Sequence, residues 1–105
     1  MTQIPVQALA AELDAGARPH ILDVRSAAEY QAGHVRGAVH IPFWMLPLRL
    51  DEVPAGRDER LIVYCGHGPR ATLARAVLTR AGFSNVATLE GHWAAWTAAQ
   101  LPIER

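Results

Sequence analysis

The chain has 105 residues, of which 50% are hydrophobic and 19% charged, as in an ordinary soluble globular domain. We therefore expect a single domain over residues 1–105. Ten arginines balance ten acidic residues and no lysine occurs, so the formal net charge is zero. A nucleic-acid-binding surface needs a clear cationic excess, and we expect no nucleic-acid partner.

The cysteine count and the apolar runs indicate which cellular compartment and which metal or disulfide sites to expect. One cysteine excludes an internal disulfide and any zinc site built from cysteine pairs. Residues 1–13 carry no basic leader and no long apolar stretch, so they do not predict a signal peptide. The longest strongly apolar run, residues 41–48, is far shorter than a membrane span and contains two prolines. We expect a cytoplasmic protein with no membrane partner, no metal and no cofactor.

The first part of the chain begins with a helical pattern. Apolar residues at helical spacing predict a helix over residues 6–13, and Gly16 is a natural stop after it. Residues 21–22 predict a brief buried strand that runs into Asp-Val-Arg. Ser26 followed by Glu29 is a capping box, in which each side chain bonds a free amide of a short helix.

The rest of the chain alternates strands and helices. The predicted elements are a small strand or extended segment at 38–41, one or two helical turns at 43–50, strands at 61–64 and 86–89, and helices with apolar positions over 73–81 and 93–99. The second of these helices is expected to pack on the sheet through Trp93 and Trp96, and the first to bury Leu73. This alternation is typical of an α/β domain built on a mostly parallel sheet.

The most informative segment follows the clearest strand. Cys65 comes directly after residues 61–64, at the end of a strand where α/β sheets place ligands. Gly66 and Gly68 let the loop curl tightly with its amides turned inward, and the following helix adds free amides and a positive dipole end. Such a cradle would stabilise the sulfur as a reactive thiolate. Arg70 adds a fixed positive charge suited to an oxyanion substrate.

Cys65 also has a plainer interpretation, as a residue of the core. A lone cysteine is most often a small buried hydrophobe, and the end of a strand can hold one. The strand on one side, the two glycines on the other and Arg70 at the start of the helix together favour the reactive thiol.

Three ordered segments of the chain carry a family resemblance. They are residues 21–25 with Glu29-Tyr30, 33–38 and 40–42; residues 64–70; and residues 89–96 with Leu101-Pro102. In these segments the chain resembles a rhodanese domain over nearly its whole length.

The resemblance implies a fold, a reaction and a site. The fold would be a rhodanese-like central, mostly parallel five-stranded sheet flanked by helices on both faces. Cys65 would be the catalytic nucleophile, and the substrate would be bound by the following loop residues: Gly66, His67, Gly68, Pro69 and Arg70. A sulfur donor such as thiosulfate or a persulfide would load Cys65 as a persulfide. A thiophilic acceptor, namely cyanide, a thiol or a protein, would then remove the sulfur.

Two other functions were considered. Related phosphatases and arsenate reductases of similar fold carry five residues between cysteine and arginine, whereas here only residues 66–69 intervene, a tighter ring that suits one sulfur atom. A non-catalytic interaction module on the same fold is the second alternative. Inactive family members commonly lack the cysteine, so the intact loop favours an enzyme.

Two charged residues, His67 and an apolar segment are also candidates for a role in function. Asp23 and Arg25, at a strand end, are expected to pair with neighbouring charges and tie loops together rather than to catalyse. His67 is assigned to substrate contact or loop shape, because a thiolate held by amides needs no base. Residues 43–46 either pack in the core or dock a partner such as a protein acceptor, and the pattern leaves both open.

Overall fold

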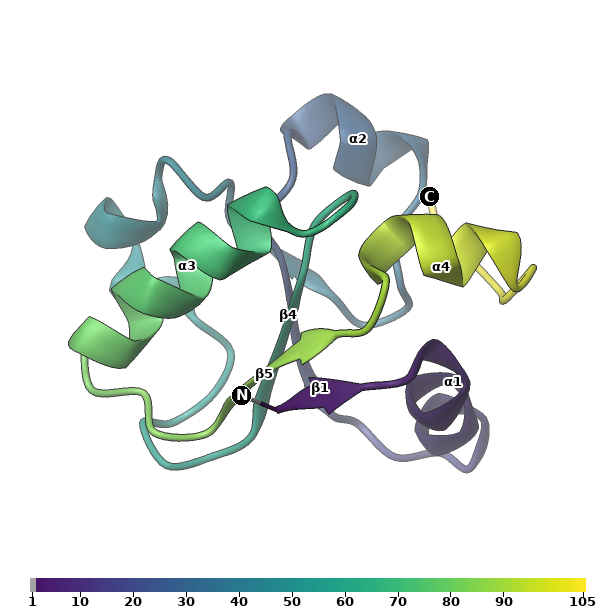
Figure 1. The fold of residues 1–105 in the computed structure, drawn as a ribbon, viewed down its shortest axis with the longest axis horizontal. Helices are drawn as coiled ribbons and strands as arrows, with labels where there is room; N and C mark the ends of the chain where they lie inside the picture. The colour runs from purple at the N-terminus through teal and green to yellow at the C-terminus, as the bar shows by residue number, and fades with distance from the viewer. Residues whose placement is uncertain (1) are drawn as a thin grey trace.

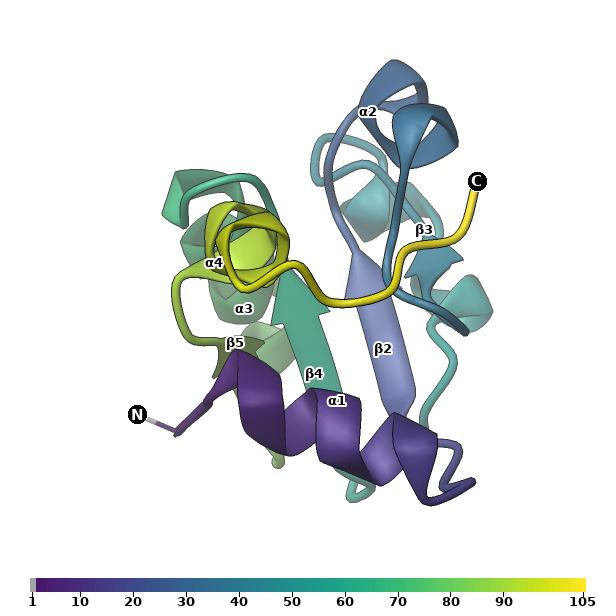
Figure 2. The same cartoon turned by 90° about the vertical axis from the view of Figure 1, so that its right-hand side faces the viewer.

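The computed structural model describes residues 2–105 as one five-stranded parallel sheet with helices on both faces (Figures 1 and 2). The strands are β1 (Gln3–Ile4), β2 (His20–Asp23), β3 (Val39–His40), β4 (Leu61–Tyr64) and β5 (Val86–Leu89). The helices are α1 (Val6–Asp14), α2 (Ala27–Ala32), α3 (Pro69–Arg80) and α4 (His92–Ala98), with short 3-10 turns η1 (Leu46–Leu48) and η2 (Leu50–Glu52). The α/β class is confirmed, and the sheet is wholly rather than mostly parallel.

The strand order β1-β5-β4-β2-β3 puts β4 in the centre of the sheet. Successive side chains of β4 point to opposite faces, as the pleat of a strand requires. Leu61 and Val63 join the core under α3, while Ile62 and Tyr64 join the core under α1 and α4. Figure 2 shows α1 and α4 in front of the sheet and α3 behind it. All four residues of β4 are fully buried, so the strand that leads to Cys65 is fixed from both sides.

The capping box predicted from Ser26 and Glu29 is confirmed. The Glu29 amide donates to Ser26 Oγ at 3.3 Å, and the Ser26 amide donates to Glu29 Oε1 at 3.0 Å. This exchange satisfies two of the free amides at the start of α2. The segment 43–50 contains η1 and then the start of η2, in agreement with the predicted one or two turns.

Two local expectations differ from the structure. Leu73 does not lie on the buried face of α3: it is 56% exposed, because the helix begins at Pro69 and buries Ala71, Ala74 and Leu78 instead. The strand β1 was not expected from the residues, since it is only two residues long and its partner β5 lies at the other end of the chain. Within residues 2–105, no helix combines the length and apolarity that crossing a bilayer requires.

Candidate active site

Cys65 is the first residue beyond β4, at the carboxyl edge of the sheet. Figure 1 shows the loop that follows it rising between α3 and α4, below α2. The start of α4 holds this loop: the Trp93 amide donates to the Cys65 carbonyl at 2.9 Å, and the Ala94 amide donates to the Gly66 carbonyl at 3.1 Å. The free amides of one helix thus fix the backbone of the loop that precedes another.

The sulfur of Cys65 is buried and faces the start of α3. The Gly68 amide donates to Cys65 Sγ at 3.0 Å, and Gly68 caps α3 with a φ of +134°, which a residue with a Cβ rarely adopts. Pro69 begins the helix and has no N–H to offer. Of the expected cradle of loop amides, the described residues therefore supply one hydrogen bond to the sulfur, together with the positive end of a twelve-residue helix.

Arg70 is not a free cation at the rim of the loop. Its Nη1 and Nη2 donate to Glu29 Oε1 and Oε2 at 2.6 and 3.1 Å, which ties the start of α3 to α2. These hydrogen bonds to Arg70, with further help from Ser26, lower the pKa of Glu29 to about 2. The guanidinium also lies close to Gly66: a Cβ added to Gly66 would be only 3.1 Å from Arg70 Nη2. A substrate anion would therefore approach an arginine whose charge Glu29 already balances.

The remaining residues of the expected site lie on the outer side of the loop. His67 and Pro69 are exposed, and Gly66 and Gly68 are partly buried. The six expected residues thus form the loop from Cys65 to Gly68 and the first two residues of α3, and His67 is exposed to solvent.

His92 was missed as a member of this site. It is 6% exposed, and its Nδ1 accepts the Cys65 amide at 3.2 Å. The signal that could have found it is topological: β5 pairs with β4 in parallel, so the residues after both strands meet at the same edge of the sheet.

Comparisons with known proteins place the chain in a family. The model of the family described as "Rhodanese-like domain" matches residues 6–99. The chain belongs to this family. It is 35% identical over 83 residues to a protein of Allochromatium vinosum named "Sulfurtransferase", a match that covers 79% of this chain and 76% of that protein. It is 31% identical over 85 residues to "Thiosulfate sulfurtransferase GlpE" of Vibrio cholerae, covering 81% of this chain and 78% of that protein.

Solved structures agree with this assignment. The crystal structure of the Alr3790 protein from Anabaena sp. superposes with a TM-score of 0.86 at 31% identity, covering 96% of this chain and 81% of that one. Family membership and the named relatives support sulfur transfer as the general activity of this rhodanese-like domain.

A buried ionic network supports the site of this rhodanese-like domain from below. Asp23 is fully buried, and its Oδ2 accepts from Arg25 Nη2 and from the Tyr64 hydroxyl, both at 2.7 Å. The guanidinium of Arg25 also donates to the Gly33 carbonyl at 2.6 Å and lies 4.5 Å from the ring centroid of Trp93. Asp23 and Arg25 pair with each other, and their contacts are structural.

The apolar segment 43–46 is divided between core and surface. Leu46 is fully buried, whereas Trp44 is 55% exposed and packs edge-on against Phe43 at a ring-centroid distance of 5.4 Å.

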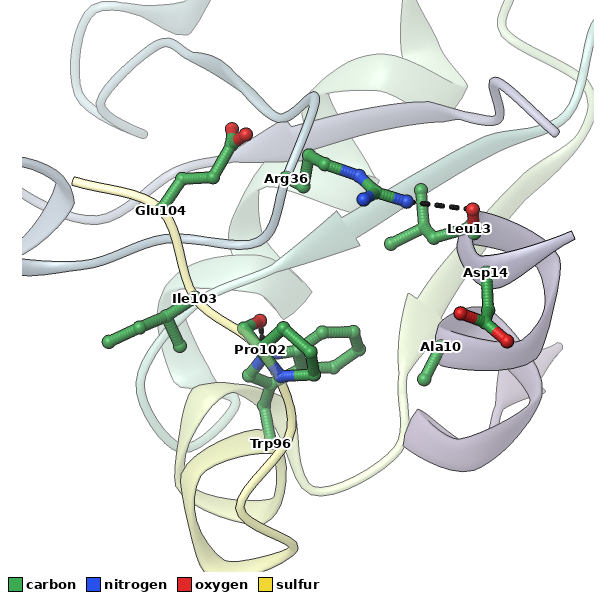
Figure 3. A pocket seen from close by; sticks show the side chains of 8 residues that line it. All are labelled: Ala10, Leu13, Asp14, Arg36, Trp96, Pro102, Ile103 and Glu104. Atoms are coloured by element: carbon green, nitrogen blue, oxygen red, sulfur yellow. Dashed lines mark hydrogen bonds between the residues drawn. The ribbon is translucent and has the colours of Figure 1, made fainter. Parts of the chain in front are cut away.

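A separate cavity of about 240 Å³ lies between α1, α4 and the C-terminal residues. Figure 3 shows Trp96 and Pro102 on one side of it and Arg36, which bonds the Leu13 carbonyl, on the other. None of the residues that line this cavity belongs to the Cys65 loop.

Proposed function

We propose that this rhodanese-like domain is a sulfurtransferase that carries a sulfane sulfur on Cys65 as a persulfide. The observation that carries the proposal is the placement of Cys65 Sγ at the start of α3, where the Gly68 amide donates to it at 3.0 Å. An amide and a helix dipole directed at a sulfur atom stabilise negative charge on it while it attacks or leaves. The names of the relatives, sulfurtransferase and thiosulfate sulfurtransferase, support the same chemistry.

The proposed reaction has two displacements. The Cys65 thiolate attacks the outer sulfur of thiosulfate, the S–S bond of the donor breaks, and sulfite leaves with the bonding electron pair. A nucleophilic acceptor then attacks the outer sulfur of the persulfide, and the Cys65 thiolate leaves with the electron pair of the broken S–S bond. The Gly68 N–H stabilises negative charge on the Cys65 sulfur, and no cofactor is required. A persulfide donor would load Cys65 in the same way, and a reducing compartment such as the cytoplasm would keep the thiol available.

The acceptor can be a small thiophile or a protein. If it is a protein, Trp44 is the best candidate for docking in the 43–46 segment, since it is exposed whereas Phe43 and Met45 are partly buried and Leu46 is fully buried. A Trp44→Ser variant should then transfer sulfur more slowly to the protein acceptor while cyanide still removes it at the native rate. Equal rates of transfer to the protein acceptor would exclude this docking site.

The decisive experiment is the intact mass of the chain after incubation with thiosulfate, with Cys65→Ser as the matched variant. We expect the native chain alone to gain the mass of one sulfur atom, and cyanide or a thiol to remove it. No gain with thiosulfate or with any persulfide donor would overturn the proposal. Hydrolysis of a phosphate ester would then indicate the phosphatase alternative, and its absence would leave the interaction module.

A further inference from the structure

His92 occupies a backbone conformation that a side chain makes costly. Its φ is +57°, in the left-handed region where glycine is favoured, and it follows Gly91, which is also left-handed at +74°. A residue with a Cβ in that region is retained only when the surrounding structure holds it there. His92 is moreover buried, with only 6% of the residue exposed to solvent. Both observations call for an explanation in the contacts of the ring.

The contacts of the ring are with the Cys65 loop. Nδ1 accepts the amide of Cys65 at 3.2 Å, so the ring is neutral with its proton on Nε2. On the other side of the ring, Nε2 lies 3.4 Å from the position that a Cβ on Gly68 would take. Gly68 is the residue whose amide donates to the Cys65 sulfur at 3.0 Å. The imidazole therefore bonds the first residue of the turn that encloses Sγ and lies beside the last.

We propose that His92 is a positioning residue for sulfur transfer, which fixes the peptide of Cys65 and the turn to Gly68 through its neutral Nδ1 acceptor. This inference rests on the proposed function and deepens it. Because the Cys65 amide is buried, an acceptor must meet it inside the protein. A side chain from the start of α4 supplies that acceptor, and the α4 amides of Trp93 and Ala94 hold the carbonyls of the same loop.

The proposed role requires the neutral ring. Burial, and to a lesser degree the nearby His67, lowers the pKa of His92, which keeps Nδ1 free to accept at neutral pH. A protonated ring would place an N–H donor opposite the Cys65 N–H donor and push the loop away. The Cys65 thiol itself faces the same turn, and the Arg70–Glu29 ion pair lies across Gly66. Of these groups, only protonation of His92 removes the acceptor of the Cys65 amide.

The test compares His92→Gly with His92→Asn. Both residues tolerate a left-handed backbone, but only asparagine carries an acceptor, Oδ1, at the place of Nδ1. We expect H92G to lower the melting temperature by only a few degrees, because relief of the backbone strain offsets part of the lost hydrogen bond and packing. H92G should nevertheless form the Cys65 persulfide roughly fivefold to tenfold more slowly. H92N should recover most of the native rate. The rate of H92N should also fall less than the native rate between pH 7.5 and pH 5, since it has no ring to protonate.

A second readout does not depend on sulfur transfer. The Cys65 amide should exchange slowly with deuterium in the native chain and in H92N, and at least tenfold faster in H92G. If the native chain fails to load sulfur, the proposed function is wrong, and exchange alone decides whether His92 anchors the loop. Native loading and exchange rates in H92G would overturn the positioning role, as would an H92N variant as slow as H92G at a similar melting temperature.

Discussion

At the scale of the residue, Asp23 is a buried carboxylate whose charge is costly to remove from water. It is fully buried and accepts three side-chain hydrogen bonds from Arg25, at 2.7 to 3.1 Å, and one from Tyr64. Arg25 is itself only 2% exposed. Taking two charges out of water is costly, and the pair is tolerated only because the partners neutralise each other and satisfy their hydrogen bonds.

We therefore predict that Asp23→Ala lowers the free energy of unfolding by about 3–5 kcal/mol, because it leaves the Arg25 guanidinium buried without a counter-charge. Tyr64→Phe is the control: it removes one hydroxyl from the same network and should cost about 1–3 kcal/mol. Urea unfolding of the three proteins at pH 7 measures both. A loss in D23A no larger than that in Y64F would show that the charge pair is unimportant.

The sequence allowed the roles of Asp23 and Arg25 to be predicted, but not their surroundings. Two opposite charges at a strand end indicate a pair from local spacing alone. The Tyr64 hydroxyl and the Gly33 carbonyl come from other segments of the chain, 41 and 8 residues away in sequence from the residues that they bond. His92 was missed for the same reason, since its partner Cys65 is 27 residues away.

At the scale of the element, the Glu29–Arg70 pair joins α2 to α3 across the loop. Glu29 has a pKa of about 2 in the folded chain, below its ordinary value of 4.5, first because of its hydrogen bonds to Arg70. A lowered carboxyl pKa stabilises the folded state above the unfolded pKa and loses that contribution as pH falls toward the folded value. The stabilisation is thus complete at pH 6 and is lost progressively between about pH 5 and pH 2.

We predict that Glu29→Gln removes this part of the acid-induced loss of stability. Both side chains are about one-third exposed, so the contribution at neutral pH should not exceed about 1 kcal/mol. The measurement is the urea midpoint of native and variant chains at pH 7, 5 and 3.5, where the two curves should converge as pH falls. Glu52→Gln is the control, because it removes an exposed pair with Arg49 that joins no elements. A constant gap between native and E29Q at all three values would contradict the prediction.

The elements themselves were largely predictable, and the exceptions have physical causes. Capping residues, glycine stops and apolar spacing indicated the four helices. Short apolar runs between turn residues indicated β2, β3, β4 and β5. The strand β1 has two residues and exists through its pairing with Thr88 and Leu89, a contact that no local pattern contains. Leu73 was placed on the wrong face of α3 because the apolar spacing was counted from Leu73 and left out Ala71, which is buried with Ala74 and Leu78.

At the scale of the whole molecule, the site depends on topology. The six predicted site residues, 65–70, are continuous in sequence, so they could be proposed together. The groups that hold these residues come from α2 and from the start of α4, and they meet the loop because the parallel order places the ends of β2, β4 and β5 at one edge. The Glu29 partner of Arg70 was not predicted, because it lies on α2, 41 residues earlier in the sequence.

The two cores lie on opposite faces of the same sheet, and this bears on the expectation of a single domain. Leu61 and Val63 belong to the core under α3, and Ile62 and Tyr64 to the core under α1 and α4. Because adjacent residues of one strand serve both cores, neither can open without disturbing the other. We therefore propose that residues 1–105 unfold as one cooperative unit.

The prediction is checked by two probes that report on different faces. Trp96 is buried in the core under α1 and α4, and Trp93 packs against that core, so tryptophan fluorescence follows this face. The longest helix, α3, has twelve residues on the other face, so the native amide NMR signals of α3 follow that face through the same urea series. A Trp44→Phe variant removes the one tryptophan that lies outside the core under α1 and α4, so its fluorescence reports on that core alone. The urea midpoints from the two probes should coincide, since a shared β4 couples the faces; separate midpoints would show that the faces unfold independently.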